Sequence, residues 1–78
     1  MKKDVIMKLE LTDREKSVLF LLAQGLKNEE ISENLHISVH TTKAHLEMIY
    51  EKLGVKNRVQ AAIKAIAMGY FELTELVK

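Results

Sequence analysis

Side chains at helical spacing between residues 39 and 53 have the chemistry to recognise the edges of DNA base pairs. At 100° per residue, His40, Ala44, Glu47 and Glu51 share one face of a helix, and Lys43 flanks that face. Lysine donates hydrogen bonds to guanine O6 or N7, an alanine methyl contacts the thymine methyl group, and glutamate accepts from the cytosine amino group. We therefore expect base contacts from Lys43, Ala44, Glu47 and His40.

Two of these residues also have a plainer interpretation. Lys43 could instead be a solvated surface lysine, which is the weaker interpretation, and Glu47 could be an outward charge paired with Lys43 or with the neighbours of Glu51. If Glu47 does meet DNA, its carboxylate repels phosphates and tolerates only a base that donates to it. It would then discriminate between DNA sites more than it would add affinity.

A second group of polar residues could hold the DNA backbone, because phosphate oxygens accept from polar side chains and from free N–H groups at a helix start. Lys27 and Asn28 lie at one expected helix start, and Lys56 and Arg58 lie at another. Arg58 could instead pair with an acid such as Glu15. Adding two residues that flank the base-reading face, we expect phosphate contacts from Lys27, Asn28, Thr41, His45, Lys56 and Arg58.

Composition limits the other kinds of chemistry. The chain has 78 residues, no cysteine and a formal net charge of +1, which fits one small domain without a thiolate metal site. Residues 36–64 hold five Lys or Arg against two Glu, a mild bias of +3 toward an anionic partner. His36 and His45 fall on different elements, so we expect no metal. Nothing resembles a nucleophile with its base or a nucleotide-holding glycine loop, so we expect no enzyme activity, cofactor or small-molecule ligand.

Capping residues mark the elements that must position these side chains. Thr12, with Glu15 three residues later, is a capping box, and Gly25 fits a left-handed C-terminal cap. These signals predict a helix over about 13–24. Asn28 is a good N-cap for a second helix of two turns.

The next two helices have equally clear starts. Ser38 is the expected N-cap of a helix over about 39–53, whose inward stripe is Thr42, Leu46, Ile49 and Leu53. Asn57, with Gln60 as its box partner, predicts a fourth helix over about 58–68. Phe71, Leu73 and Leu76 in the tail could pack back on the domain.

The helices expected at about 28–35 and 39–53 are joined by only three residues, which is the helix-turn-helix pattern. The shorter helix braces the longer one, and the longer one can enter the DNA major groove. The plain alternative is a four-helix bundle in which the short helix is only structural. Either way the sequence predicts an all-α, four-helix domain.

The fourth helix is apolar nearly all round, which leaves a second apolar face once one face is buried on the core. We expect this face to form a two-fold dimer that presents two reading helices to neighbouring turns of DNA. The alternative is that the tail folds over it. The expected dimer residues are Val59, Ala62, Ile63, Ile66 and Ala67.

Four segments resemble the LuxR/GerE family of DNA-binding domains: LTDRE at 11–15, GLKNEEI at 25–31, ISVHTTKAHL at 37–46 and YEKLGVKNRVQAA at 50–62. The resemblance covers about residues 9–70 without gaps. It implies a GerE-like domain at 11–70, between a polar lead-in at 1–10 and a short tail at 71–78, whose third helix reads DNA and whose fourth often pairs with a second copy. It also implies a DNA role for Lys43, and a phosphate contact or a packing role for His45.

Two positions depart from the pattern of that family. Thr42 stands where valine is typical on the inward face, and Ser32 stands where alanine is typical. Both side chains are small enough to bond back to the preceding turn. A buried Thr42 hydroxyl would still need a hydrogen-bond partner.

Together these patterns predict a bacterial, cytoplasmic regulator of transcription that binds double-stranded DNA as a homodimer, with RNA polymerase as a further partner if it activates. The longest wholly apolar run, 18–23, is too short to cross a membrane. We expect a free-standing regulator. The alternatives are the DNA-binding piece of a longer two-component response regulator, and a protein-binding module that uses the fourth helix.

Overall fold

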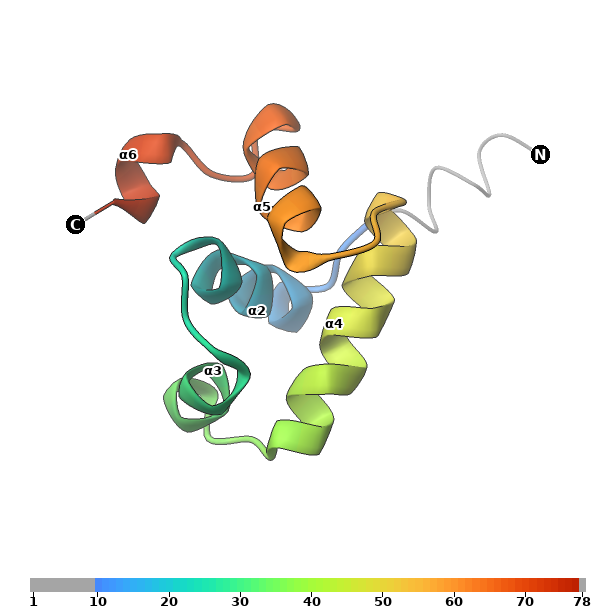
Figure 1. Ribbon diagram of the computed structural model, residues 1–78, viewed down its shortest axis with the longest axis vertical. Coiled ribbons are helices and arrows are strands. Elements are labelled where there is room, and N and C mark those ends of the chain that lie inside the picture. The colour runs from blue at the N-terminus through green and yellow to red at the C-terminus, as the bar shows by residue number, and fades with distance from the viewer. Residues whose placement is uncertain (1–9, 78) are drawn as a thin grey trace.

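The computed structural model describes residues 10–77, which form five helices (Figure 1). In chain order these are α2 (Asp13–Ala23), α3 (Asn28–Leu35), α4 (Val39–Leu53), α5 (Arg58–Ala67) and α6 (Leu73–Leu76). The described residues contain no strand, so the predicted all-α helix-turn-helix fold is confirmed. Apart from Glu10, the expected polar lead-in lies outside the described residues.

The helix starts are held by side chains that satisfy otherwise free backbone N–H groups. Thr12 Oγ1 accepts from the Glu15 N–H at 3.1 Å while the Glu15 carboxylate accepts from the Thr12 N–H at 2.9 Å, which confirms the capping box of α2. Ser38 caps α4 through the Thr41 N–H at 3.0 Å. Asn57 caps α5 in the same way, at 2.9 Å from the nitrogen of Gln60. The predicted box partner was wrong by one residue, because Gln60 Oε1 accepts from the Lys56 N–H at 2.8 Å and not from the Asn57 N–H.

Some predicted helix ends were wrong by a residue. The first helix ends at Ala23 because Gln24 is already its C-cap, and α5 ends at Ala67 because Met68 is the C-cap. Asn28 is not an N-cap either, since it is the first residue of α3 and Lys27 is the cap. The Lys27 side chain makes no capping hydrogen bond, and the Glu30 carboxylate accepts from the Lys27 N–H at 2.7 Å. The carboxylate of Glu30 thus satisfies the N–H of the cap residue, while no side chain of the cap accepts from the first-turn N–H groups, which is the task that we assigned to the asparagine.

The turn between α3 and α4 depends on an unusual backbone conformation. His36 has a φ of +59° and is a residue other than glycine in the left-handed region. This conformation lets the Ile37 N–H return to the Ser32 carbonyl at 3.0 Å, which ends α3 within one residue. Gly54, with a φ of +70°, ends α4 by the same geometry. The tight turn sets the angle at which α4 leaves α3.

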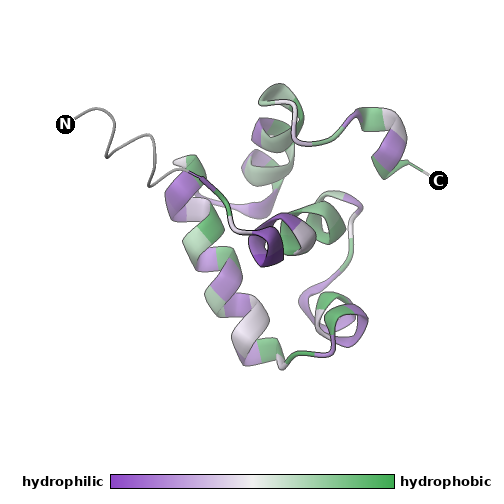
Figure 2. Ribbon diagram, turned by 180° about the vertical axis from the view of Figure 1, so that it is seen from behind, coloured by the Kyte–Doolittle hydropathy of each residue, from purple (hydrophilic) through white to green (hydrophobic). Residues whose placement is uncertain are grey.

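The core lies where α2 packs against α5, α4 and α3. Its fully buried members include Leu19 from α2, Ile31 from α3, Ile49 from α4 and Ala65 from α5. Figure 2 shows apolar stretches on the helix sides that face one another, with polar residues on the outer sides. The predicted inward stripe of α4 is confirmed, because Thr42, Leu46, Ile49 and Leu53 are all buried.

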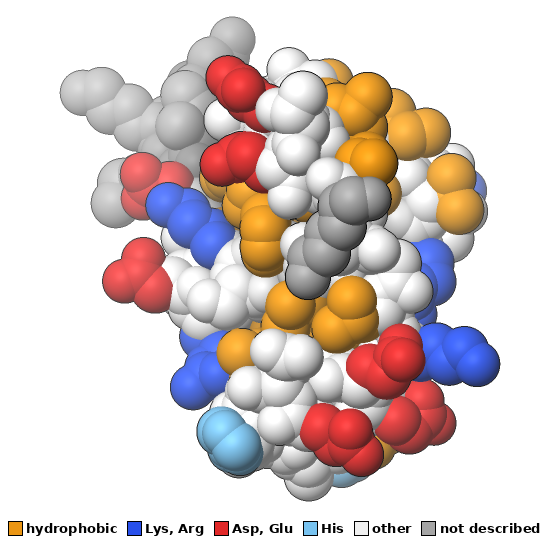
Figure 3. All heavy atoms as spheres, turned by 90° about the vertical axis from the view of Figure 1, so that its left-hand side faces the viewer, with side chains coloured by type: hydrophobic (Ala, Val, Ile, Leu, Met, Phe, Trp, Pro, Cys, Tyr) orange, Lys and Arg blue, Asp and Glu red, His pale blue; other side chains and the backbone are white. Residues whose placement is uncertain are grey.

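The tail packs on α2 and leaves the outer face of α5 uncovered within the described residues. The ring of Phe71 meets that of Phe20 edge to face, with centroids 5.0 Å apart, and Leu76 is buried. Leu73 stays 61% exposed, so only two of the three tail residues expected to pack back do so. Figure 3, which views the side where α3 and α6 lie, shows apolar atoms between these helices, a group of acidic side chains at the lower right and further acidic side chains at the upper left.

Candidate nucleic-acid interface

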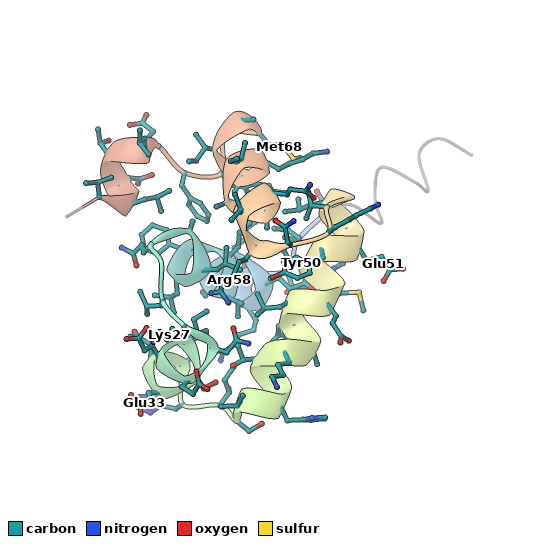
Figure 4. All side chains as sticks on the ribbon, viewed as in Figure 1. Lys27, Glu33, Tyr50, Glu51, Arg58 and Met68 are labelled. Atoms are coloured by element: carbon teal, nitrogen blue, oxygen red, sulfur yellow. The ribbon has the colours of Figure 1, made fainter. Side chains whose placement is uncertain are left out.

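The outer face of α4 carries the four residues from which we expect base contacts. His40, Lys43, Ala44 and Glu47 are all exposed, while the opposite stripe of the same helix is buried in the core. In Figure 4 the labelled side chain of Glu51 projects from this helix away from the other helices. A rigid helix therefore presents these side chains on one open face, as the helical spacing predicted.

No charged group in the described residues neutralises Glu47. Among residues 10–77 no ion pair involves this carboxylate, including with Lys43. Within the described residues Glu47 is therefore not part of an ion pair along α4. An exposed, unpaired carboxylate on this face repels phosphates and favours only a hydrogen-bond donor.

At the start of α4 the hydroxyl groups of Ser38 and Thr41 are hydrogen-bonded to each other. Ser38 Oγ donates to Thr41 Oγ1 at 2.9 Å and accepts from the Thr41 N–H. Thr41 and His45 are both partly exposed on the flank of the base-reading face. Since Thr41 Oγ1 accepts from Ser38, its own proton remains to be donated to a phosphate oxygen.

A second open helix start lies at α3. The N–H groups of Asn28, Glu29 and Glu30 have no intrahelical partner, because the ladder begins with Ile31 donating to the Lys27 carbonyl at 2.9 Å. Lys27 is exposed beside them. The arrangement matches a phosphate-binding helix start, although the two glutamates oppose an anion there.

Arg58 joins the start of α5 to the start of α3. Its Nη1 donates to Asn28 Oδ1 at 3.1 Å and its Nη2 donates to the Leu26 carbonyl. The suggested pair with Glu15 was wrong, because the guanidinium points to the α2–α3 connection. Two of the five N–H groups of this partly buried guanidinium are engaged by these acceptors. Figure 4 shows Arg58 running from α5 toward that connection.

These elements enclose a shallow hollow of about 240 Å³ between α3, α4 and α5. Its lining residues are Asn28, Lys43, Leu46, Glu47, Tyr50 and Arg58. Four of them are predicted DNA contacts, so residues far apart in sequence meet on one surface. The sequence interpretation did not include Tyr50, which is partly buried in this hollow. Its position could have been noticed, because Tyr50 is an aromatic residue one helical turn after Leu46 and flanks the outer face of α4.

The partner of Glu15 is Lys52, in the last turn of α4. Lys52 Nζ lies 2.8 Å from Glu15 Oε1, and both side chains are largely buried. Burial alone would raise the pKa of the Glu15 carboxyl, but hydrogen bonds from Lys52 and Thr12 together with the lysine charge hold that pKa below its ordinary value. This pair ties α2 to the C-terminal end of α4.

The outer face of α5 keeps its apolar side chains in solvent. Val59 is 65% and Ile63 is 63% exposed, and Ala62, Ile66 and Ala67 are partly or fully exposed. Ala61 and Ala65 on the other side are buried. The residues expected at a dimer contact therefore share one accessible face that the tail does not cover.

Within residues 10–77, no helix is both long and apolar enough to span a bilayer. The same residues contain no group of three His, Asp or Glu side chains placed to hold a metal ion.

Comparison with known proteins connects this geometry to a family. Residues 9–65 match the family described as bacterial regulatory proteins, luxR family. The chain is 45% identical over 62 residues to the transcriptional regulatory protein DesR of Bacillus subtilis, and 48% identical over 61 residues to the putative HTH-type transcriptional regulator YhjB of Escherichia coli. It is 46% identical over 55 residues to the response regulator protein VraR of Staphylococcus aureus.

The matched segments make up most of this chain and a minor part of each relative. They cover 80% of the chain for DesR, 78% for YhjB and 70% for VraR. They cover 31%, 30% and 26% of those three proteins. The similarity therefore extends over the helix-turn-helix domain and leaves out about two thirds of each relative.

Proposed function

Because the chain belongs to the luxR family of bacterial regulatory proteins, we propose that it regulates transcription by reading duplex DNA with α4 while bound as a homodimer through α5. The family is one of DNA-binding regulators and not of enzymes. The observation that carries the proposal is the exposed face of α4, which bears four polar or small side chains while the opposite face of the helix is buried in the core. As a regulator of bacterial transcription it would act in the cytoplasm, where the DNA is.

In this proposal the base contacts come from Lys43, Ala44, Glu47 and His40, and Lys43 donates to guanine. Phosphates are held at the starts of α3 and α5 by Lys27, Asn28, Lys56 and Arg58, and on the flank of α4 by Thr41 and His45. Only three of those six side chains carry a permanent positive charge. The logarithm of affinity should therefore fall with the logarithm of salt with a slope of about −3 per domain.

The proposed dimer is supported by the exposed apolar face of α5. Two copies joined there would place two α4 helices about one turn of DNA apart, roughly 34 Å, on a two-fold related site. If the protein activates transcription, RNA polymerase is the expected further partner.

A second candidate keeps the same chemistry within a larger regulator. The matched segment is about three tenths of DesR and a quarter of VraR, which is named a response regulator. Because the matched segment is a minor part of these regulators, a domain of this kind can serve as the DNA-binding part of a longer chain. The third possibility is a protein-binding module that uses the exposed face of α5, and its best support is the weakly basic character of the α4 face.

The test is selection of bound sequences from a randomised duplex library, followed by titration of the enriched duplex at two salt concentrations. We expect a two-fold related motif, and a loss of about tenfold in affinity for Lys43→Ala. Lys64→Ala, which removes an exposed lysine of α5, is the matched control and should change affinity less than twofold. Enrichment of no sequence, with equal and weak binding by both variants, would overturn the proposal.

A further inference from the structure

The two helices of the helix-turn-helix are joined by a buried contact between hydroxyl groups. Ser32 Oγ on α3 lies 2.7 Å from Thr42 Oγ1 on α4. Thr42 is fully buried and Ser32 is 5% exposed, so water does not reach the contact. Neither residue faces the DNA surface described above.

The direction of this hydrogen bond follows from the other bond that Ser32 makes. Ser32 Oγ lies 2.7 Å from the Asn28 carbonyl, which can only accept, so the single serine proton is given to that oxygen. The Ser32 oxygen must therefore accept from Thr42. A directed chain of bonds runs from Thr42 through Ser32 to Asn28.

The chain continues to the third helix of the interface. The side-chain oxygen of Asn28 accepts from Arg58 Nη1, and Arg58 also donates to the Leu26 carbonyl. Hydrogen bonds thus connect α4, α3 and α5 around the hollow that Lys43 and Glu47 line. The next residue after Thr42 along α4 is Lys43, so a shift of α4 at this point moves the expected base contact with it.

We propose that Ser32 and Thr42 are positioning residues: their hydrogen bond draws α4 against α3 and so sets where the reading helix stands relative to the phosphate-binding helix starts. The argument is one of distance. Two hydroxyl oxygens meet at 2.7 Å, whereas two carbon atoms pack at about 3.5–4.0 Å. A methyl group in place of either hydroxyl moves the helices apart or leaves a gap. This inference rests on the proposed reading of DNA by α4.

Folding measurements test the bond without DNA. Thr42→Val puts a methyl group against the Ser32 oxygen, and Ser32→Ala leaves the Thr42 proton to seek a carbonyl of its own helix. Each should raise the equilibrium constant of unfolding roughly tenfold, as expected for a buried polar group that loses its partner. The double variant, in which the methyl fills the space of the lost oxygen, should lose much less than the two single effects combined. Purely additive effects would overturn the bond as a coupled unit.

DNA specificity tests the positioning role, at a temperature where every variant is fully folded. The quantity is the ratio of affinities for the enriched duplex and for a random duplex of the same length, at one salt concentration. We expect Thr42→Val, Ser32→Ala and the double variant each to lower this ratio at least threefold. The phosphate contacts that dominate random-duplex affinity stay the same.

The conservative variant Thr42→Ser separates positioning from packing. It keeps the hydroxyl and loses a buried methyl, so it should destabilise the fold yet keep the affinity ratio of the wild type within twofold. The double variant is the converse, because it should lose much less stability than the two single effects combined and still show a lowered affinity ratio. If the ratio follows stability across the four variants, the pair is only part of the core and the proposal fails. If the wild type itself prefers no duplex, the proposed function fails, and the unfolding cycle still reports separately whether the two hydroxyls are coupled.

Discussion

Replacing Lys52 by methionine should destabilise the domain, because the substitution leaves a buried carboxylate without its cation. The Lys52 Nζ to Glu15 Oε1 distance is 2.8 Å, and the two side chains are 19% and 7% exposed. Pairs on the surface contribute about 0–1 kcal/mol, whereas loss of one member of a fully buried pair costs about 3–5 kcal/mol. The partial exposure of the lysine puts Lys52→Met between these limits, at about 2 kcal/mol.

Urea denaturation at pH 7 measures this cost directly, and thermal unfolding should show a fall in Tm of roughly 10 °C. Lys64→Met is the matched control, since it removes the same charge and side-chain type from an exposed position on α5. Its free energy of unfolding should stay within about 0.5 kcal/mol of the wild type. Equal effects of the two substitutions would refute the assignment of the pair.

The pH dependence has a definite sign. Because the folded-state pKa of Glu15 lies below its ordinary 4.5, the ionised carboxylate stabilises the fold above that pH. This contribution is lost as the pH falls through the lower folded-state pKa. In Lys52→Met burial dominates, the pKa rises, and protonation relieves the isolated charge. The stability gap between wild type and variant should therefore narrow below about pH 4. A gap that stays constant from pH 7 to pH 3 contradicts the reasoning.

Three further predictions concern the turn at His36, the Arg58 side chain and the outer face of α5. His36→Gly removes a left-handed strain of about 1–2 kcal/mol against a glycine entropy cost of about 0.5–1 kcal/mol, so urea denaturation should show equal or higher stability; a clear loss would mean that the imidazole itself stabilises the turn. Arg58→Lys should cost about 1–2 kcal/mol of stability and keep the salt slope of DNA binding, because the positive charge remains. Arg58→Met should also lose stability and should in addition have a smaller salt slope. Equal salt slopes for the two variants would exclude a phosphate contact. Ile63→Asp should abolish two-to-one complexes on the enriched duplex in sedimentation, and Leu73→Asp, equally exposed on α6, should not; a matching loss in both would point to a contact outside α5.

The parts of the structure that the sequence predicted are those set by short spacings. The two residues of the capping box, Thr12 and Glu15, are three positions apart, and the capping bonds of Ser38 and Asn57 have the same separation. Such local signals decide where helices begin, and the apolar stripe of α4 decides which side is buried. The open face of α4 follows directly from these two facts.

Pairings between helices could not be predicted, because side chains compete for partners that no spacing identifies. The sequence suggested Glu15 as an alternative partner of Arg58. The structure instead pairs Glu15 with Lys52, 37 residues away, and Arg58 with Asn28, 30 residues away. Thr42 illustrates the same limit. A buried hydroxyl on its stripe requires a partner, but only the crossing of α3 and α4 reveals that Ser32 is the one.

The most direct test of the account is to map the DNA contact on the chain by amide chemical-shift changes in NMR as an enriched duplex is added. The account predicts the largest changes along α4 from His40 to Glu47, with a second set at the starts of α3 and α5. Changes confined to the outer face of α5, or to α2 and α6, with α4 unaffected, would contradict the claim that α4 reads DNA.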